Sequence, residues 1–375
     1  MIGGSAGGPQ GTHRSHPGPD PAHHGARPSG ASPTGLAPDA AHHTATEAAP
    51  DVGAPPKVIG GRDAHGVPRF DQQVPQGGYL WWYIDALSDD GRHGLSIIAF
   101  VGSVFSPYYA WARARGRGDP DNFCAINVAL YGAGGRRWAM TERGRRSLHR
   151  ERGAFVVGPS RMAWEHDALT VRFDERAAPI PRRVRGQIRL HTEGLCRFVA
   201  GLDAAGRHRW GPIAPCARIE VQLEHPSVRW SGAAYFDSNE GDEPIDRAFH
   251  DWDWSRARMQ DGTTAVIYDV RPRTGPARVI AERFEPNGRF APFSAPERQV
   301  LPSSMWRIAR GVRSDTGYRA RVVDTLEDTP FYVRSTLDCS LMGEPVTAIH
   351  ESISMPRLTS LPVRLMLPWK MPRLA

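Results

Sequence analysis

Two short stretches of the sequence carry the side chains best suited to chemistry. The first, HRWGPI, contains His208 and Trp210, and the second, WSGAAYFDSNEG, contains Tyr235 and Asp237. Residues two apart in a strand share a face, so each pair would place a polar group and an aromatic ring on one wall. A buried carboxyl group can act as an acid, an imidazole can relay protons or hold water, and aromatic faces stabilise cations. The four residues therefore indicate an aromatic-lined site with one carboxylic acid.

The rest of the sequence offers few other chemical motifs. It contains no Walker A, HExxH, GxSxG or dinucleotide-binding pattern. The cysteines, Cys124, Cys196, Cys216 and Cys339, lack the paired spacings of zinc sites and redox dithiols. We therefore expect buried thiols in a reducing compartment, no metal and no cofactor.

The surroundings of Tyr235 and Asp237 leave structural alternatives open. The small residues GAA before Tyr235 would leave room for a bulky ligand in front of a barrel wall, but the pair could also simply end a strand, with Asp237 capping a turn. Gly241 is the fifth residue counted from Asp237, whereas an EF-hand calcium loop needs its glycine sixth. We therefore expect a solvated loop rather than a calcium site from the acidic cluster Asp237, Glu240, Asp242, Glu243 and Asp246.

The segment FHDWDW also alternates as a strand would. Its spacing predicts one face with His250, Trp252 and Trp254 and the opposite face with Phe249, Asp251 and Asp253. Tryptophans at this spacing are more typical of a core than of a site.

These residues must be positioned by β-strands. From Phe70 onward, short β-favouring runs alternate with Gly, Pro, Asp and Asn, which is typical of an all-β sandwich or barrel. YYAWARAR, at residues 108–115, is the best candidate for a short helix. The expected strands are YLWWYIDALS and GLSIIAFVGSV, joined by a turn at Asp90-Gly91, then FCAINVALYG, ALTVRF, GQIRL, ARIEVQLE, VRWSGAAYF, TTAVIYDV, ARVIAERF, YRARVVDTLED, PFYVRST and VTAIHESI.

The number of runs predicts an all-β protein with two lipocalin-like β-barrel domains in tandem, preceded by a disordered N-terminal tail. Residues 1–66 contain no Phe, Tyr or Trp, so they cannot bury enough apolar surface to offset the entropy of ordering. The domains are predicted at residues 67–240 and 241–375, because DSNEGDEPID has the acidic, Gly and Pro residues of a junction.

The charge of the chain limits which classes of partner we expect. The net charge is +7, and Lys57 and Lys370 are the two lysines among 47 basic residues, so the rest are arginines spread along the chain. This even spread of arginines favours compositional bias over nucleic-acid binding. Each basic residue near an anionic membrane would still add roughly 1 kcal/mol of attraction to it. No apolar stretch is long enough to span a membrane, and residues 1–30 lack a signal-peptide core. We expect a cytoplasmic protein or one on the inner face of a membrane.

Four stretches rich in Trp and Tyr are long enough to compare with known families. They are GGYLWWYIDALSDDGRHGLSIIAFVGSVFSPYYAWAR, HRWGPIAPCARIEV, WSGAAYFDSNEGDEPID and FHDWDWSRA. Together they resemble carotenoid 1,2-hydratase, also called hydroxyneurosporene synthase, of purple photosynthetic bacteria. The resemblance extends from residue 75 to residue 340 and leaves the predicted tail outside.

The resemblance implies a pair of lipocalin-like domains and a cofactor-independent hydration. Water would add to the terminal 1,2-double bond of an acyclic carotenoid such as lycopene or neurosporene, through protonation, a tertiary carbocation and water capture. By the same resemblance, Asp237 is the catalytic acid, accompanied by Tyr235, His208 and Trp210. The roles of Asp237 as acid and His208 as helper could be reversed.

The implied partners are the acyclic carotenoid and water, with no nucleic acid. Because the substrate dissolves in lipid, we expect a cytoplasmic protein in peripheral contact with the inner or intracytoplasmic membrane, with other carotenoid-pathway enzymes as possible partners. RLMLPWKMPRL, at residues 364–374, is a candidate membrane contact, although we favour an ordinary terminal strand there.

Two other functions remain open at this stage. A non-catalytic lipocalin-type carrier of carotenoids or other hydrophobic ligands would need the cavity but not the acid. An unrelated hydrolase or isomerase could use the same fold, because a fold does not fix chemistry. The presence of both Asp237 and His208 favours the enzyme over the carrier.

Overall fold

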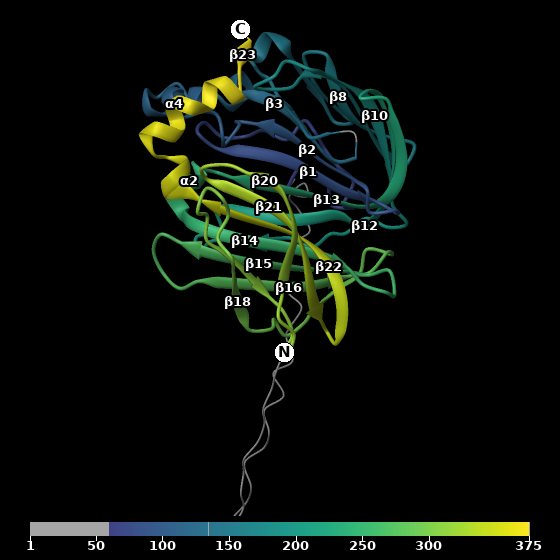
Figure 1. The fold of residues 1–375 in the computed structure, drawn as a ribbon. Coiled ribbons are helices and arrows are strands. Elements are labelled where there is room, and N and C mark those ends of the chain that lie inside the picture. Colours follow the sequence, from purple (N-terminus) through teal and green to yellow (C-terminus); the bar gives the residue numbers. More distant parts are fainter. Residues whose placement is uncertain (1–59, 134, 375) are drawn as a thin grey trace, which may run out of the picture. The chain divides into compact units, whose positions relative to one another are not determined.

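The computed structural model describes residues 60–133 and 135–374, which belong to one compact unit, Ala54–Ala375. Residues 1–59, the greater part of the predicted tail, lie outside the described residues. The described chain consists mostly of strands, which confirms the all-β expectation. Figure 1 shows the blue and teal strands of the N-terminal half above the green and yellow strands of the C-terminal half.

Within the described residues, the first sheet has 14 strands. Their order is β23-β5-β3-β2-β1-β13-β12-β10-β9-β8-β7-β6, with β11 beside β12 and β4 beside β3. The bounds are β1 (Tyr79–Ser88), β2 (His93–Val101), β3 (Cys124–Gly132), β4 (Arg137–Met140), β5 (Glu142–Arg143), β6 (Leu148–Glu151), β7 (Ala154–Val157), β8 (Ser160–Glu165), β9 (Ala168–Arg176), β10 (Arg183–His191), β11 (Ala200–Gly201), β12 (His208–His225), β13 (Val228–Gly241) and β23 (Arg373–Leu374).

The second sheet has 7 strands in the described chain, in the order β17-β16-β15-β14-β22-β21-β20, and β18 pairs with β19 separately. The bounds are β14 (Phe249–Arg258), β15 (Thr264–Pro272), β16 (Arg278–Phe284), β17 (Phe290–Pro292), β18 (Arg298–Leu301), β19 (Arg310–Arg313), β20 (Arg321–Asp328), β21 (Tyr332–Leu341) and β22 (Glu344–Ser354). The helices are α1 (Pro107–Ala114), α2 (Ile245–Ala248), α3 (Met355–Leu358) and α4 (Leu361–Lys370), with 3₁₀ turns η1 (Pro120–Asn122) and η2 (Arg145–Ser147).

Neither of the two large sheets closes on itself. Among the described strands, each hydrogen-bonded order runs from one edge strand to another, from β23 to β6 and from β17 to β20. The prediction of closed barrels is therefore corrected to two open sheets. Strongly twisted sheets of this size can enclose a core by curling without closing the last hydrogen-bonded pair.

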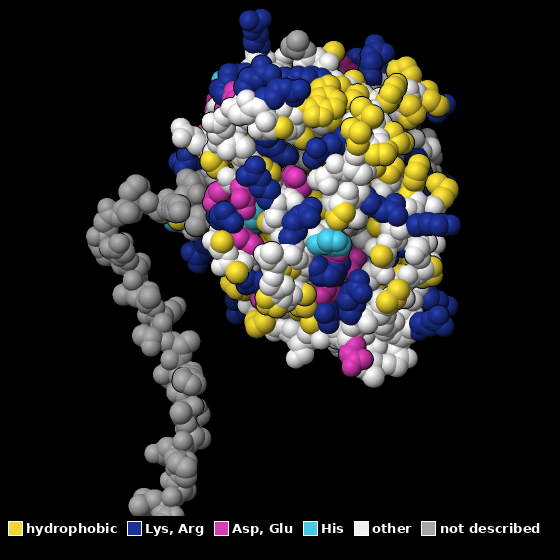
Figure 2. All heavy atoms as spheres, turned by 90° about the vertical axis from the view of Figure 1, so that its left-hand side faces the viewer, with side chains coloured by type: hydrophobic (Ala, Val, Ile, Leu, Met, Phe, Trp, Pro, Cys, Tyr) yellow, Lys and Arg dark blue, Asp and Glu magenta, His cyan; other side chains and the backbone are white. Residues whose placement is uncertain are grey.

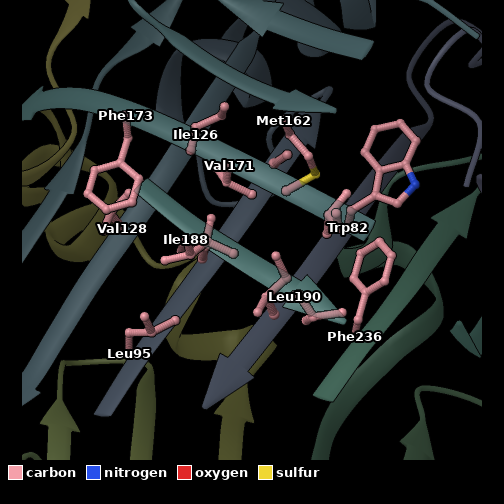
Figure 3. Packing of buried hydrophobic residues seen from close by; sticks show 14 of the residues in the cluster. Trp82, Leu95, Ile126, Val128, Met162, Val171, Phe173, Ile188, Leu190 and Phe236 are labelled. Atoms are coloured by element: carbon pink, nitrogen blue, oxygen red, sulfur yellow. The ribbon is translucent and has the colours of Figure 1, made fainter. Parts of the chain in front are cut away.

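The two faces of β1 enter different interiors. Leu80, Trp82 and Ile84 point into the inner core, a cluster enclosed by strands β1–β3, β7–β10, β12 and β13 of the first sheet (Figure 3). Trp81 and Tyr83 point the other way, into the inter-sheet interior, where they join side chains of β14, β15 and β22. Because side chains alternate along a strand, β1 contributes large residues to both interiors.

Each predicted strand run overlaps a strand of the structure, and the predicted short helix is α1. Helix α1 begins at Pro107, whose fixed φ suits a first helical position. The Ser106 hydroxyl oxygen accepts a hydrogen bond from the Tyr109 amide at 3.0 Å, which caps the helix.

The segment FHDWDW begins β14 but departs from strict alternation. The register between β14 and β15 shifts between Phe249 and Asp251, as expected at a β-bulge. Consequently Phe249 joins Trp252 and Trp254 in the inter-sheet interior, while His250 is exposed. The expectation that the tryptophans share a face is confirmed, and the placement of His250 with them is wrong because of the extra residue in the bulge.

Residues 60–66, the end of the predicted tail, are packed against the first sheet. Arg62 is buried and donates a hydrogen bond to the Cys196 carbonyl at 3.0 Å. The Gly61 carbonyl accepts one from Trp82 Nε1 at 3.2 Å, and a Cβ at Gly61 would lie 2.4 Å from that nitrogen. The packed part of the chain therefore begins before the predicted boundary at residue 67.

Residues 361–370 form helix α4, which corrects the expected terminal strand. The apolar residues recur with helical spacing, so that Val363 and Leu367 are buried on one side, and Pro362 lies in the first turn. Strand β23 follows the helix and pairs in parallel with β5. None of the helices in the described residues is long and apolar enough to cross a membrane.

Candidate active site

A cavity of about 970 Å³ lies in the inter-sheet interior, between the strands of the first sheet and those of the second. Its wall is mainly aromatic and includes Trp81, Phe100, Trp210, Trp252, Trp254 and Tyr268. Three carboxylate residues also line it, namely Asp237, Glu327 and Glu351. Such a cavity suits an apolar ligand with a few fixed polar contacts.

The strands β12 and β13 bring three of the four predicted residues together. They pair antiparallel, with Trp210 opposite Asn239 and Pro212 opposite Asp237. Trp210 Nε1 donates a hydrogen bond to Asp237 Oδ2 at 2.7 Å, and the Tyr235 hydroxyl donates to the same oxygen at 3.0 Å. The expected sharing of a face by Tyr235 and Asp237 is thus confirmed by a direct contact.

Asp237 is 2% exposed, and this burial raises its pKa to about 8 because the charged form loses its hydration. The hydrogen bonds from Trp210 and Tyr235 favour the charged form and lower the pKa, but burial outweighs them. Both donors take Oδ2, so the proton of the neutral acid belongs on Oδ1. Among the described residues Oδ1 has no hydrogen-bond partner. Burial therefore favours the neutral acid, and the oxygen that would carry its proton is left without a partner among these residues.

Trp210 and Tyr235 differ in their relation to the cavity. Trp210 lines it, with its ring edge-on to Tyr268 at a centroid distance of 5.5 Å. Tyr235 is fully buried behind the wall, where its ring lies 5.3 Å from that of Trp254. Trp254 therefore lines the cavity, and Tyr235 packs against it from behind.

His208 is buried but is not among the residues that line the cavity. Its Nδ1 lies 2.9 Å from the Tyr79 hydroxyl, and its Nε2 lies 3.6 Å from Glu243 Oε1. Burial lowers the pKa of His208, which favours the neutral ring. Tyr79 stacks on Trp81 at a centroid distance of 5.0 Å, and Trp81 lines the cavity. The geometry therefore gives His208 a supporting position behind the wall.

Glu351 is a second carboxyl group in the cavity wall, and sequence reasoning missed it. The Tyr83 hydroxyl lies 2.8 Å from Glu351 Oε1 and 2.8 Å from Asp85 Oδ2, and it can donate to one of them at a time. Arg334 donates to Glu351, and Arg256 donates to Asp85 from Nε at 2.6 Å. Burial raises the pKa of Glu351, whereas Arg334 and Tyr83 favour its charged form.

A sequence signal for Glu351 existed in the strand β22. Alternation places Ile349, Glu351 and Ile353 on one face, and the two isoleucines belong to the inter-sheet interior. A lone acid between two core residues is unusual, because charged side chains are seldom buried without a partner. The partner, Arg334, lies on β21 directly opposite Glu351.

The acidic segment after Asp237 is held by arginines. Arg209 pairs with Glu240 and with Asp242, the latter at 2.8 Å, and Arg113 pairs with Asp246 at 3.3 Å. The described residues contain no group of three or more His, Cys, Asp or Glu side chains arranged to hold a metal ion.

The small residues before Tyr235 do not open the cavity. A Cβ at Gly232 would lie 1.9 Å from the Leu87 carbonyl oxygen, so this glycine permits close approach of β1 and β13. Ala234 packs in the inner core, on the opposite face from Asp237. Ala234 therefore lies on the other side of the sheet from the cavity, and Ala233, on the same face as Asp237, is not among the residues that line it.

Helix α4 covers one end of the cavity. Leu367 and Lys370, together with Met371 after the helix, belong to the lining. The Lys370 ammonium group lies 3.1 Å from Glu327 Oε1 and 4.4 Å from the ring centre of Trp138. A C-terminal helix thus stands over the aromatic interior.

Comparison with known proteins gives a consistent set of relatives. A family model described as carotenoid hydratase CrtC matches residues 97–375. The chain is 63% identical over 312 residues to an acyclic carotenoid 1,2-hydratase of Rubrivivax gelatinosus, covering 83% of this chain and 77% of the relative. It is 54% identical over 315 residues to an acyclic carotenoid 1,2-hydratase of Thiocapsa roseopersicina, covering 84% of this chain and 78% of the relative.

Among solved structures, one of Nitrosomonas europaea described as AttH is similar in fold. It superposes with a TM-score of 0.53 over 80% of this chain and 98% of that chain, at 14% sequence identity. At this identity the similarity concerns the fold alone, which is of the lipocalin-like AttH type.

Proposed function

The chain belongs to the carotenoid hydratase family and is a hydro-lyase that hydrates the terminal 1,2-double bond of acyclic carotenoids; we propose that Asp237 is its acid. The observation that carries this proposal is the free Oδ1 of a neutral, buried carboxyl group in an aromatic cavity. The substrates would be lycopene and neurosporene, and the products tertiary 1-hydroxycarotenoids.

The first step is transfer of the Asp237 Oδ1 proton to the less substituted carbon of the terminal double bond. A new C–H bond forms from the π electrons, and the neighbouring carbon becomes a tertiary cation. The carboxylate that remains keeps its hydrogen bonds from Trp210 and Tyr235 at Oδ2. These donors stabilise the charge that develops there, as preorganised donors do in other acid–base sites.

The cation would be stabilised by the faces of the cavity tryptophans. Trp210, Trp252 and Trp254 all line the cavity, and Trp254 belongs to the strand facing β13 across it. A desolvated cation over an aromatic face gains on the order of 2 kcal/mol per ring. The apolar lining also limits the number of water molecules that can reach the cation.

Water capture needs a base, and Glu351 is the group in the cavity that fits this role. Arg334 donates to Glu351 and favours its charged form, whereas among the described residues the donors to Asp237 are the uncharged Trp210 and Tyr235, and burial favours its neutral form. Two carboxyl groups whose surroundings separate their pKa values can divide acid and base roles. The water oxygen bonds to the cation and loses a proton to Glu351. Glu351 then releases this proton to solvent and Asp237 takes one up from solvent, so the site ends as it began.

His208 and Tyr235 complete the proposed site as positioning residues. Tyr235 holds the Asp237 carboxyl group through its hydroxyl. His208 supports the cavity wall through Tyr79 and Trp81. The alternative of His208 as the acid is less favoured, because burial keeps its ring neutral and the ring lies outside the lining.

The two sheets would be two lipocalin-like domains with a junction near residues 240 and 241. Strands β1–β12 precede this junction, β13 ends at it and β14–β22 follow it, while β23 returns to the first sheet. The site then lies between the domains. Since the substrate dissolves in lipid, we further propose a cytoplasmic protein in peripheral contact with the inner or intracytoplasmic membrane. A non-catalytic carrier would have no use for a free acid in the cavity.

The test is expression in cells that accumulate lycopene, followed by pigment analysis in water enriched with heavy oxygen. We expect tertiary 1-hydroxy products that carry the heavy oxygen. Label entering only from molecular oxygen would contradict hydration and indicate an oxygenase.

The role of Glu351 is tested with Glu351→Gln in D₂O. Hydration should fall by about 10²-fold or more, while protonation by Asp237 continues and its reversal leaves deuterium in the recovered carotenoid. Glu327→Gln is the matched control, because Glu327 lines the same cavity but pairs with Lys370. Unchanged hydration in Glu351→Gln, or an equal loss in Glu327→Gln, would remove Glu351 from the mechanism.

A further inference from the structure

Helix α4 is apolar on two opposite sides. Its inner side, with Val363 and Leu367, is buried over the cavity. Its outer side repeats Leu361, Leu365 and Trp369 at intervals of four residues, and these side chains are 67%, 52% and 75% exposed. A helix that is apolar all round belongs in a protein core or in lipid. Protein covers only the inner side of α4 within the described residues.

The segment that carries this outer side is rich in basic residues, of which Lys370 and Arg373 are paired with Glu327 and Glu142. The segment from residue 355 to the end of the sequence contains Arg357, Arg364, Lys370 and Arg373 and no acidic residue. Arg357 donates a hydrogen bond to the carbonyl of Trp306 at 2.8 Å, and Trp306 and its neighbour Met305 are also exposed. Figure 2 shows hydrophobic side chains gathered on the face that carries α4, with Lys and Arg side chains beside them. Exposed aromatic and aliphatic residues beside cations suit the surface of an anionic bilayer.

The same helix separates this surface from the cavity. Leu367 and Met371 line the cavity directly behind the exposed side chains of α4. The cavity is lined by Asp237 and, under the helix, by Leu367 and Met371, so a polyene whose end lies beside Asp237 can extend toward α4. The part of a long polyene that reaches past the helix would remain in a medium that dissolves it.

We propose that the outer side of α4 docks on an anionic lipid bilayer and delivers the end of the polyene under the helix into the cavity. This inference rests on the proposed function, because it takes the substrate from lipid. Leu361, Leu365 and Trp369 enter the interface, and Arg364 faces the anionic headgroups. Lys370 remains with Glu327 at the cavity end.

The experiment compares two double variants of the full chain. Leu365→Gln with Trp369→Gln alters the outer side of α4, and Val279→Gln with Val300→Gln is the matched control on β16 and β18. The control residues are 38% and 82% exposed. Binding is measured by flotation with vesicles of phosphatidylcholine and phosphatidylglycerol, and with vesicles of phosphatidylcholine alone.

We expect the α4 variant to bind mixed vesicles at least about tenfold more weakly, since two exposed apolar side chains no longer enter the interface. The control variant should bind as the unaltered protein does, and pure phosphatidylcholine should bind less of all three proteins. Hydration of a carotenoid supplied in vesicles should fall with binding, whereas hydration of a detergent-dispersed carotenoid should not change.

Two results would overturn the inference. One is equal vesicle binding by the α4 variant and the unaltered protein. The other is a change in oligomeric state of the α4 variant without a change in vesicle binding, which would assign this surface to a second copy of the chain. Failure of the proposed function would look different, because the unaltered protein would then hydrate no carotenoid, whether in vesicles or in detergent.

Discussion

The inner core and the inter-sheet interior are built by opposite faces of the same strands. On β1 and β13, Ile84 and Phe236 enter the inner core, while Tyr83, Tyr235 and Asp237 enter the inter-sheet interior. The inner core receives aliphatic and aromatic side chains in contact with one another, as Figure 3 shows. The opposite face receives hydroxyl and carboxyl groups that need partners when buried. The alternation of side chains along these strands therefore separates the residues that stabilise the fold from those of the proposed site.

The comparison also shows how Asp237, the proposed acid, is supported on a strand of the first sheet. The inner core fixes the backbone of β13 from behind, so that the side chain of Asp237 is presented from a rigid element. Rigid support keeps Trp210 and Tyr235 at hydrogen-bond distance from one oxygen and leaves the other free. Changes on the two faces of the sheet should accordingly have different kinds of effect.

The largest effect on chemistry should come from Asp237→Asn. The amide nearly keeps the shape of the carboxyl group but has no acidic proton, so hydration should fall at or above the upper end of the 10²–10⁴-fold range of general acids. In D₂O the recovered carotenoid should also contain no deuterium. The measurement is turnover per folded protein at matched protein levels. Near-normal turnover would transfer the acid role to His208 or another carboxyl group.

The same variant should change how stability depends on pH. In the folded protein the pKa of Asp237 is raised from 3.8 to about 8, so its contribution to stability is complete below pH 3.8 and is lost as pH rises through 8. The amide of Asp237→Asn does not titrate. The free energy of unfolding of this variant should therefore rise relative to that of the unaltered protein as the pH rises from 3.8 to 8. Urea unfolding at several pH values measures the difference. A parallel pH dependence in both proteins would mean that Asp237 is ionised when folded.

Much of this arrangement could be predicted from the sequence, because it follows from local alternation. The strand runs, the capped helix α1 and the shared faces of Tyr235 with Asp237 each depend on residues close together in the chain. The location of the cavity could not be predicted in this way, because it depends on which side of the first sheet the second sheet covers. Glu351 was missed for the same reason, since its partners Tyr83 and Arg334 come from other strands.

Irregular geometry accounts for the remaining errors. The bulge after Phe249 moves His250 to the surface, and nothing in FHDWDW marks the extra residue. The end of the chain was expected to be a strand, although Leu361, Leu365 and Trp369 recur at a helical interval of four. A short and mostly apolar pattern with two prolines is hard to assign without knowing what it packs against.

The next largest effect, on the other face of the sheet, should come from Ile84→Ala. Ile84 is fully buried in the inner core, next to Tyr83 in the chain but on the opposite side of β1. Removing its side chain should reduce the free energy of unfolding by about 2–5 kcal/mol, with turnover per folded molecule unchanged. Urea unfolding and activity at low temperature measure the two quantities. A selective loss of turnover with normal stability would erase the distinction between the two interiors.

Replacement of Trp210 should give a smaller and graded loss of activity. Trp210→Ala removes both the hydrogen bond to Asp237 and an aromatic face, so turnover should fall by about 10–100-fold. Trp210→Phe restores a ring without the donor and should recover part of that loss. The comparison uses turnover at saturating carotenoid. Equal activities of the two variants would mean that the ring face contributes nothing to the cation.

The smallest effect should come from Tyr235→Phe, and its sign is informative. The Tyr235 hydroxyl donates to Asp237 Oδ2 at 3.0 Å and thereby favours the ionised carboxylate. Without this donor the pKa of Asp237 should rise further, by up to about one unit for a net hydrogen bond of about 1 kcal/mol. The fall of activity at alkaline pH should move to higher pH, and the maximal rate should drop by less than about tenfold, because a weaker acid protonates the alkene more slowly.

Tyr268→Phe is the control, since Tyr268 lines the cavity and its ring contacts Trp210, yet its hydroxyl is not a donor to Asp237. A shift to lower pH in Tyr235→Phe, or the same shift in Tyr268→Phe, would show that the alkaline limit of activity does not report the proton on Asp237.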